Sequence, residues 1–222
     1  MFGRTQAVAA ILVAGTISMG AISASVFAQS SSPPQKPQPE SGDPLVRSRQ
    51  LPEYTAAGDL KLPTGWRYWI FVGDPFTPNA LNGGKANFPE FHNVYIEPGS
   101  YAIYKKTGVF PEGTIFVKEL QLTTQPAEHA DGSQTQPSGR GYFPAGFNGA
   151  DVTVKDSKRF AATDGWGYFN FHHFEPKALT AKVQAKGECA FCHIASAKRD
   201  DVWTQFYSIL DEVPAPGGNK GG

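Results

Sequence analysis

The sequence predicts an α+β domain, built mainly from an antiparallel β-sheet with a few helices. Segments with the composition of strands occupy the chain up to about residue 174, and helix-favouring sequence rich in Ala and Lys follows from residue 177. A run of strands followed by a run of helices is typical of α+β domains. The segment from residue 45 to 213 is long enough to form one domain with its own core.

Five segments rich in aromatic and β-branched residues are expected to be strands: residues 66–72, 93–96, 114–122, 151–155 and 166–174. The first lies between two turn-forming tripeptides, Pro63-Thr64-Gly65 and Gly73-Asp74-Pro75. The third follows a Pro-Glu-Gly turn. These boundaries place most of the predicted sheet before residue 175.

Three helices are expected. A short one over residues 101–106 has Ser100 as a plausible N-cap and Gly108 as its end. The second covers residues 177–197. The third, over residues 202–210, follows Asp200 or Asp201 as a cap. Its apolar side chains share one face: Val202, Phe206, Ile209 and Leu210.

Both ends of the chain differ in composition from the domain. Residues 1–28 read as a signal peptide, with Arg4 in the charged region, an apolar run and cleavage after Ala28. The alternative is an uncleaved anchor, although polar residues interrupt the apolar run. Residues 29–44 read as a disordered Pro-, Ser- and Gln-rich linker, and residues 214–222 as a flexible tail. The 20 basic and 20 acidic residues balance, which argues against a nucleic-acid-binding surface.

The most informative motif is Cys189-Ala190-Phe191-Cys192-His193, on the predicted second helix, which holds the only two cysteines. Cys-x-x-Cys-His is the attachment signature of c-type haem, with the histidine as an axial iron ligand. A zinc site would need further histidines, a redox pair would need a βαβ context, and a disulfide here would close a very short loop. Haem attachment agrees with the predicted export, and both indicate a periplasmic protein.

The second axial ligand is not methionine. Met1 and Met19 are the only methionines and both lie in the predicted signal peptide, which excludes the common His/Met electron carrier. A second histidine could bind the iron, and the candidates are His92, His129, His172 and His173. Otherwise the sixth position is open and binds a small molecule.

Lys118 lies inside a predicted strand. Alternate residues of a strand share a face, so Phe116, Lys118 and Leu120 fall together and the lysine has apolar neighbours. Such a lysine either extends its ammonium group to water or, when desolvated, loses its proton and becomes a nucleophile.

The chain resembles the cytochrome P460 family over nearly the whole predicted domain. The matching segments include Trp66-Arg67-Tyr68-Trp69, Leu81-Asn82, Val94-Tyr95-Ile96, Ser100-Tyr101-Ala102, Val117-Lys118-Glu119-Leu120, Gly141-Tyr142-Phe143, residues 154–161 and Glu188-Cys189-Ala190 with Cys192-His193. The resemblance implies a β-rich homodimer with one haem c per subunit, bound through Cys189 and Cys192 with His193 on the iron. It also implies a covalent bond from Lys118 to the haem macrocycle, with Phe116 in the pocket wall.

The resemblance implies oxidation of hydroxylamine to nitrous oxide, nitric oxide or nitrite, with electrons passed to another cytochrome c. Related proteins called cytochromes c′-β lack the lysine bond and bind nitric oxide, which is the alternative function here. A bis-histidine electron carrier is a third. His92 stands where relatives can carry arginine, and Asp151 where a distal glutamate is found. Asp151 is expected to accept protons from the substrate, and His92 to relay them or to approach the iron.

Overall fold

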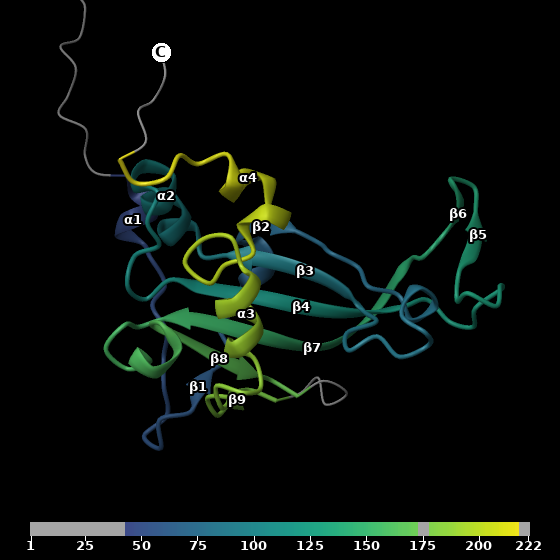
Figure 1. Ribbon diagram of the computed structural model, residues 1–222, viewed down its shortest axis with the longest axis horizontal. Helices are drawn as coiled ribbons and strands as arrows, with labels where there is room; N and C mark the ends of the chain where they lie inside the picture. The colour runs from purple at the N-terminus through teal and green to yellow at the C-terminus, as the bar shows by residue number, and fades with distance from the viewer. Residues whose placement is uncertain (1–42, 173–177, 218–222) are drawn as a thin grey trace, which may run out of the picture. The chain divides into compact units, whose positions relative to one another are not determined.

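The computed structural model describes residues 43–172 and 178–217. Its centre is a five-stranded antiparallel sheet in the order β2-β3-β4-β7-β8 (Figure 1). The strands are β2 (Ile70–Gly73), β3 (Phe91–Ile96), β4 (Ile115–Thr123), β7 (Pro144–Lys155) and β8 (Trp166–Asn170). Two short ladders pair β1 (Leu60–Lys61) with β9 (Thr180–Ala181), and β5 (Gln134–Gln136) with β6 (Gly139–Gly141). The antiparallel pairing confirms the predicted α+β class.

The helices are few and mostly short. They are α1 (Pro44–Arg47), α2 (Pro98–Thr107), α3 (Ala190–Ser196) and α4 (Ser208–Asp211), with 3₁₀ turns η1 (Trp66–Tyr68), η2 (Asn79–Leu81), η3 (Ala161–Thr163) and η4 (Thr204–Phe206). Helix α2 ends at Gly108 as predicted, because Gly108 takes the left-handed conformation at φ 73°. Its N-cap is Glu97 rather than Ser100, since the Glu97 carboxylate accepts from the Gly99 and Ser100 amides.

Three predicted strand boundaries were wrong. The strand expected at residue 66 begins at Ile70, because Gly65 at φ 69° turns the chain into η1 first. The strand over residues 151–155 is longer and begins at Pro144. The strand over residues 166–174 ends at Asn170. Residues 173–174 lie outside the described part of the chain.

The two late helices were also overestimated. Of the helix expected over residues 177–197, residue 177 lies outside the described part of the chain and only α3 is helical in the rest, because Thr180–Ala181 pairs with β1 and tertiary pairing overrides the helix propensity of Ala and Lys. The last helix is broken into η4 and α4, since Tyr207 between them has a non-helical backbone with φ −123° and ψ 86°. Asp200 and Asp201 do not cap it; both lie in a turn with positive φ.

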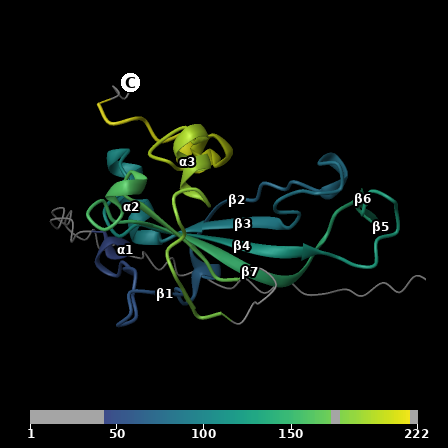
Figure 2. The same cartoon turned by 60° about the horizontal axis from the view of Figure 1, so that its bottom comes forward.

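Each face of the sheet is covered (Figure 2). On one face, α3 and the segment that follows it pack over the strands. The buried side chains there include Val94, Ile96, Phe116, Trp166, Tyr168, Ala190, Val202 and Leu210. On the other face, β1, η1 and β9 contribute to a second core with Leu60, Trp66, Val117, Ala150, Val152, Phe169 and Ala181. The alternation of β4 between these cores places even-numbered residues on the α3 face.

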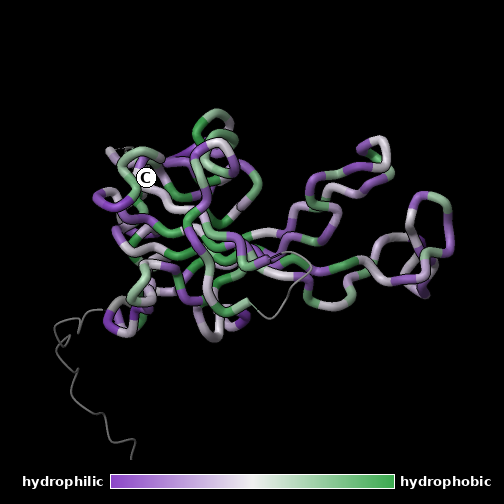
Figure 3. Tube along the Cα trace, turned by 90° about the horizontal axis from the view of Figure 1, so that it is seen from below, coloured by the Kyte–Doolittle hydropathy of each residue, from purple (hydrophilic) through white to green (hydrophobic). Residues whose placement is uncertain are grey.

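The β5–β6 ladder projects away from the sheet (Figure 1), and hydrophobic stretches concentrate along the central strands (Figure 3). Among residues 43–172 and 178–217, none of the helices is both long and apolar enough to cross a bilayer. The predicted signal peptide and nearly all of the linker lie outside the described residues.

Candidate functional site

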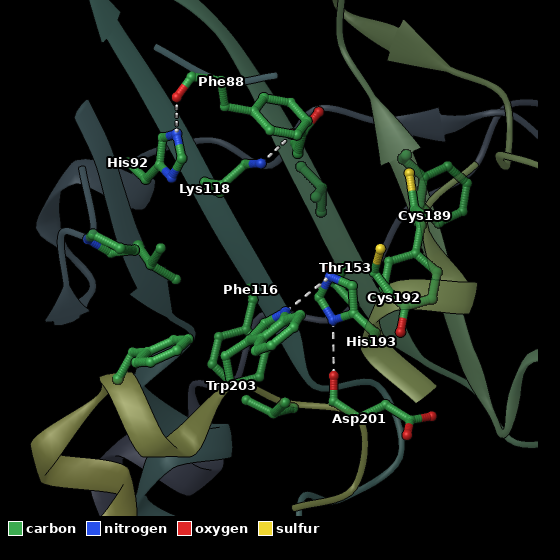
Figure 4. Close-up of a pocket in the computed structure, with 18 of the residues that line it drawn as sticks. Phe88, His92, Phe116, Lys118, Thr153, Cys189, Cys192, His193, Asp201 and Trp203 are labelled. Carbon is green, nitrogen blue, oxygen red and sulfur yellow. Dashed lines mark hydrogen bonds and ion pairs between the residues drawn. The ribbon is translucent and has the colours of Figure 1, made fainter. Parts of the chain in front are cut away.

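A cavity of about 400 Å³ lies between the sheet and α3. This volume is within the range of small-molecule and cofactor pockets. Its lining includes every site residue expected from the sequence: His92, Phe116, Lys118, Asp151, Cys189, Cys192 and His193. Three distant parts of the chain, β3, β4–β7 and α3, bring these side chains together, and Figure 4 shows Lys118 and His92 at one end of the cavity and His193 at the other.

The Cys-x-x-Cys-His motif begins α3. Cys189 is the residue before the helix, Cys192 and His193 lie in its first turns, and both thiols are free. Burial raises the pKa of the Cys189 thiol. Since both sulfur atoms line the cavity, each can reach a group held inside it.

The partners of His193 define its tautomer. Its Nδ1 lies 2.8 Å from the Asp201 carbonyl oxygen, which can only accept, so Nδ1 carries the proton. The Trp203 indole N–H, which can only donate, lies 3.3 Å from Nε2. Nε2 therefore presents its lone pair, as an iron ligand must, and iron at this atom would replace the indole contact. Burial lowers the pKa of His193, which favours the neutral imidazole that binds metals.

Two aromatic rings contact the imidazole. The Tyr168 ring centroid lies 4.7 Å from that of His193, and the Trp203 centroid lies 5.4 Å from it. Phe206 stacks on Trp203 at 5.9 Å and continues the apolar wall. The Tyr168 hydroxyl is buried and makes no hydrogen bond, and burial raises the pKa of this phenol.

Lys118 and Asp151 form an ion pair at the other end of the cavity. They are opposite each other in the β4–β7 register, and Nζ lies 2.7 Å from Oδ2. The Lys118 ammonium also lies 3.9 Å from the centroid of the Phe88 ring. The Lys118 side chain is 25 % exposed, so it lies against the cavity wall instead of extending fully into water. Phe116 lines the same cavity, which confirms that Phe116 and Lys118 share a face.

His92 lies on β3, two residues from Val94, the register partner of Lys118. It is 8 % exposed, and its Nε2 lies 3.2 Å from the Phe88 carbonyl oxygen (Figure 4). This acceptor places the proton of His92 on Nε2.

The other histidines are elsewhere. His129 bonds Thr135 near the projecting ladder, His172 follows β8 at φ 55°, and neither lines the cavity. His173 lies outside the described residues. Within residues 43–172 and 178–217, no three or more His, Cys, Asp or Glu side chains are arranged to hold a metal ion. Because neither His129 nor His172 lines the cavity, the structure does not support either of them as the second iron ligand.

Four residues of the cavity have no signal in the sequence: Phe88, Tyr168, Asp201 and Trp203. Asp201 and Trp203 come shortly after His193 in the sequence. This short separation is the only indication in the sequence that they lie near His193 in space. Phe88 comes just before β3, and Tyr168 lies on β8. The sequence pattern alone does not show that these two parts of the chain meet at one cavity.

These residues fit a c-type haem. Two free thiols, a histidine whose Nε2 lone pair points into the cavity and apolar aromatic walls are the groups that such a cofactor needs. The family model for cytochrome P460 matches residues 63–204, more than half of the 222-residue chain. Among curated proteins, none matches the sequence. The match spans the sheet, Lys118 and the Cys-x-x-Cys-His motif. The chain therefore belongs to the cytochrome P460 family, a family of c-type haem proteins of the oxidoreductase class.

Proposed function

We propose that this protein oxidises hydroxylamine at an open iron position, in the part of the cavity lined by Lys118 and Asp151. The observation that supports this most is the Lys118–Asp151 pair, whose atoms lie 2.7 Å apart in the same cavity as His193. A plain electron carrier has no need for a carboxylate and an amine beside its cofactor. A hydroxylamine oxidase needs a group that takes protons as electrons leave the substrate.

In this proposal the haem is held by Cys189 and Cys192 as thioethers and by His193 through Nε2, and Lys118 is bonded to the macrocycle. The haem, when bound, accepts the electrons that the substrate loses. A covalent bond at Lys118 Nζ would end the ion pair with Asp151. The Asp151 carboxylate would then lie beside the substrate without the charge of the Lys118 ammonium next to it.

Asp151 is proposed as the general base. Its carboxylate is 22 % exposed and is held by the rigid β4–β7 pairing, so it is positioned without a loop movement. His92, buried and oriented by its bond to the Phe88 carbonyl, is proposed to relay the proton toward solvent. Phe88 and Phe116 limit the cavity to small ligands.

The physiological setting is proposed on the predicted signal peptide and the family resemblance. We place the protein in the periplasm as a homodimer that passes electrons to a soluble cytochrome c. The main alternative is a nitric oxide-binding protein without turnover, which the apolar walls around Lys118 would also suit. A bis-histidine carrier would require His92, the one candidate in the described part of the chain that lines the cavity, to release the Phe88 carbonyl.

The test is turnover of hydroxylamine by the haem-loaded protein with an artificial electron acceptor, together with its ferrous absorption spectrum. Asp151→Asn should lower turnover by about 10²–10⁴-fold, the usual contribution of a general base, with the haem still bound. Glu53→Gln is the matched control, because it breaks an exposed Lys–Glu pair with Lys61 far from the cavity lining. Wild-type protein that binds nitric oxide but does not turn over hydroxylamine would establish the alternative.

A further inference from the structure

The carbonyl group that holds His193 belongs to an unusual turn. Val202 N–H donates to the Arg199 carbonyl at 2.9 Å, and Arg199 N–H points back to the Val202 carbonyl at 3.4 Å. The two residues between them, Asp200 and Asp201, have φ of 48° and 56°. Two consecutive positive φ angles define a type I′ turn, which normally carries Asn-Gly or Asp-Gly. A non-glycine pair in this conformation must be held by its surroundings.

Lys155 of β7 provides that restraint. Its Nζ lies 2.7 Å from both carboxylate oxygens of Asp200. Lys155 is 9 % exposed, and its ammonium lies 4.8 Å from the centroid of the Trp166 ring. The Trp166 indole N–H also points to Asp200 Oδ1 at 3.3 Å. The sheet thus fixes Asp200 by an ion pair whose lysine is buried and whose carboxylate is partly exposed.

This restraint fixes the position of the Asp201 carbonyl group. It accepts from His193 Nδ1 at 2.8 Å (Figure 4). Tyr168 and Trp203 contact the imidazole and limit its rotation. The ring therefore fixes the direction of the N–H bond, and the turn fixes the position of the acceptor. Hydrogen bonds to the second nitrogen of a metal-binding histidine orient the ring and raise its basicity as a ligand.

We infer that Lys155 and Asp200 are positioning residues for the haem: through the Asp201 carbonyl they set how strongly His193 donates to the iron, and therefore the reduction potential. This inference rests on the part of the proposed function in which His193 binds iron, and not on the oxidation of hydroxylamine. A strong Nδ1–H···O=C bond makes the imidazole a better donor and favours the ferric state. A turn that is no longer held weakens this bond and favours the ferrous state.

The test compares Lys155→Met and Asp200→Ala in the haem-loaded protein. The two changes remove charges of opposite sign, so a direct Coulomb effect on the iron would lower the potential in the first and raise it in the second. Positioning predicts a rise in both. We expect the ferric–ferrous equilibrium to shift toward ferrous by up to about tenfold, or ~59 mV for one electron, because the net contribution of one hydrogen bond is of this order.

The iron–histidine stretching band in resonance Raman spectra of the ferrous protein is the second readout. Its frequency should fall in both variants. Lys198→Met is the matched control: Lys198 makes a similar two-oxygen contact with Asp211 at 2.6 and 2.9 Å, but its side chain is 53 % exposed and the pair does not involve the turn. This control should keep the wild-type frequency.

The double variant Lys155→Met/Asp200→Ala covers the case in which a single change leaves an unpaired buried charge and the protein does not fold. It leaves the net charge unchanged, so a raised potential and a lowered frequency would support positioning directly. Potential shifts of opposite sign in the single variants, or a double variant with wild-type potential and frequency, would overturn the inference. Both readouts are independent of turnover, so a protein that binds haem but does not oxidise hydroxylamine still tests the inference.

Discussion

The buried hydroxyl of Tyr168 leads to a prediction about alkaline stability. The residue is 4 % exposed, its hydroxyl has no hydrogen-bond partner, and burial raises the pKa of the phenol above its usual value of about 10. The folded state therefore keeps the proton at a pH where the unfolded state releases it. The corresponding stability is fully present below pH 10 and is lost as the pH rises above it, toward the raised folded pKa.

The size of the effect follows from linkage. At one pH unit above the unfolded pKa, one tyrosine that stays neutral only in the folded state lowers the free energy of unfolding by about 1.4 kcal/mol. Tyr168→Phe cannot ionise at this position. Between pH 8 and pH 11 its free energy of unfolding should therefore fall by about 1.4 kcal/mol less than that of the wild type. At pH 8 the variant should be more stable by about 1 kcal/mol, because a buried hydroxyl without a partner is unfavourable.

The assay is chemical denaturation of the haem-loaded protein at both pH values. Tyr68→Phe is the control, since the Tyr68 side chain is 92 % exposed and its hydroxyl meets water in both states. Equal losses of stability in the wild type and in Tyr168→Phe would show that the phenol ionises in the folded protein, and the reasoning would fail. A Tyr168→Phe variant that is less stable at pH 8 would show that the hydroxyl has a partner in the loaded protein.

Three further outcomes are expected. The proposed lysine–haem bond should shift the ferrous Soret band to longer wavelength, and Lys118→Met should remove this shift and the extra tether seen in the mass of the haem peptide, with the haem still attached; a retained shift would mean that another residue is bonded to the macrocycle. Gly167→Ala should cost about 1–3 kcal/mol or more in thermal denaturation, because a Cβ there would lie 2.4 Å from the Phe160 ring, whereas Gly146→Ala meets no atom within 4 Å and should not. Glu97→Ala should cost about 2 kcal/mol, since the buried carboxylate caps α2 through two backbone amides, and a loss below 0.5 kcal/mol would contradict that role.

The sequence predicted the strands that carry the site better than the helices that complete it. β3 and β4 are rich in aromatic and aliphatic residues, and the alternation along β4 correctly places Phe116 and Lys118 on one face. Helix α3 is short because residues 180–181 pair with β1, a contact between segments about 120 residues apart in the chain. Such long-range pairing leaves no local pattern.

The turn at Asp200 and Asp201 was misread for a similar reason. Aspartate before an apolar run is a common N-cap signal, and the sequence offers no indication that Lys155 holds one of these residues in a left-handed conformation. The restraint comes from a strand 45 residues earlier. Composition likewise identifies the Cys-x-x-Cys-His motif but not the Asp201 carbonyl that orients its histidine.

The two ends of the cavity are positioned by different physical means. Lys118 and Asp151 depend on the register of β4 and β7, and a slip by one residue would turn Lys118 away and bring Glu119, now buried on the other face with Arg67, into the cavity. The irregular pairing of these strands begins only beyond Glu119, on the side of the projecting ladder, so the register at the cavity is regular. His193, in contrast, depends on a strained turn held by one ion pair. Changes to the sheet should therefore affect substrate chemistry, and changes at Lys155 should affect the potential of the haem without moving Asp151.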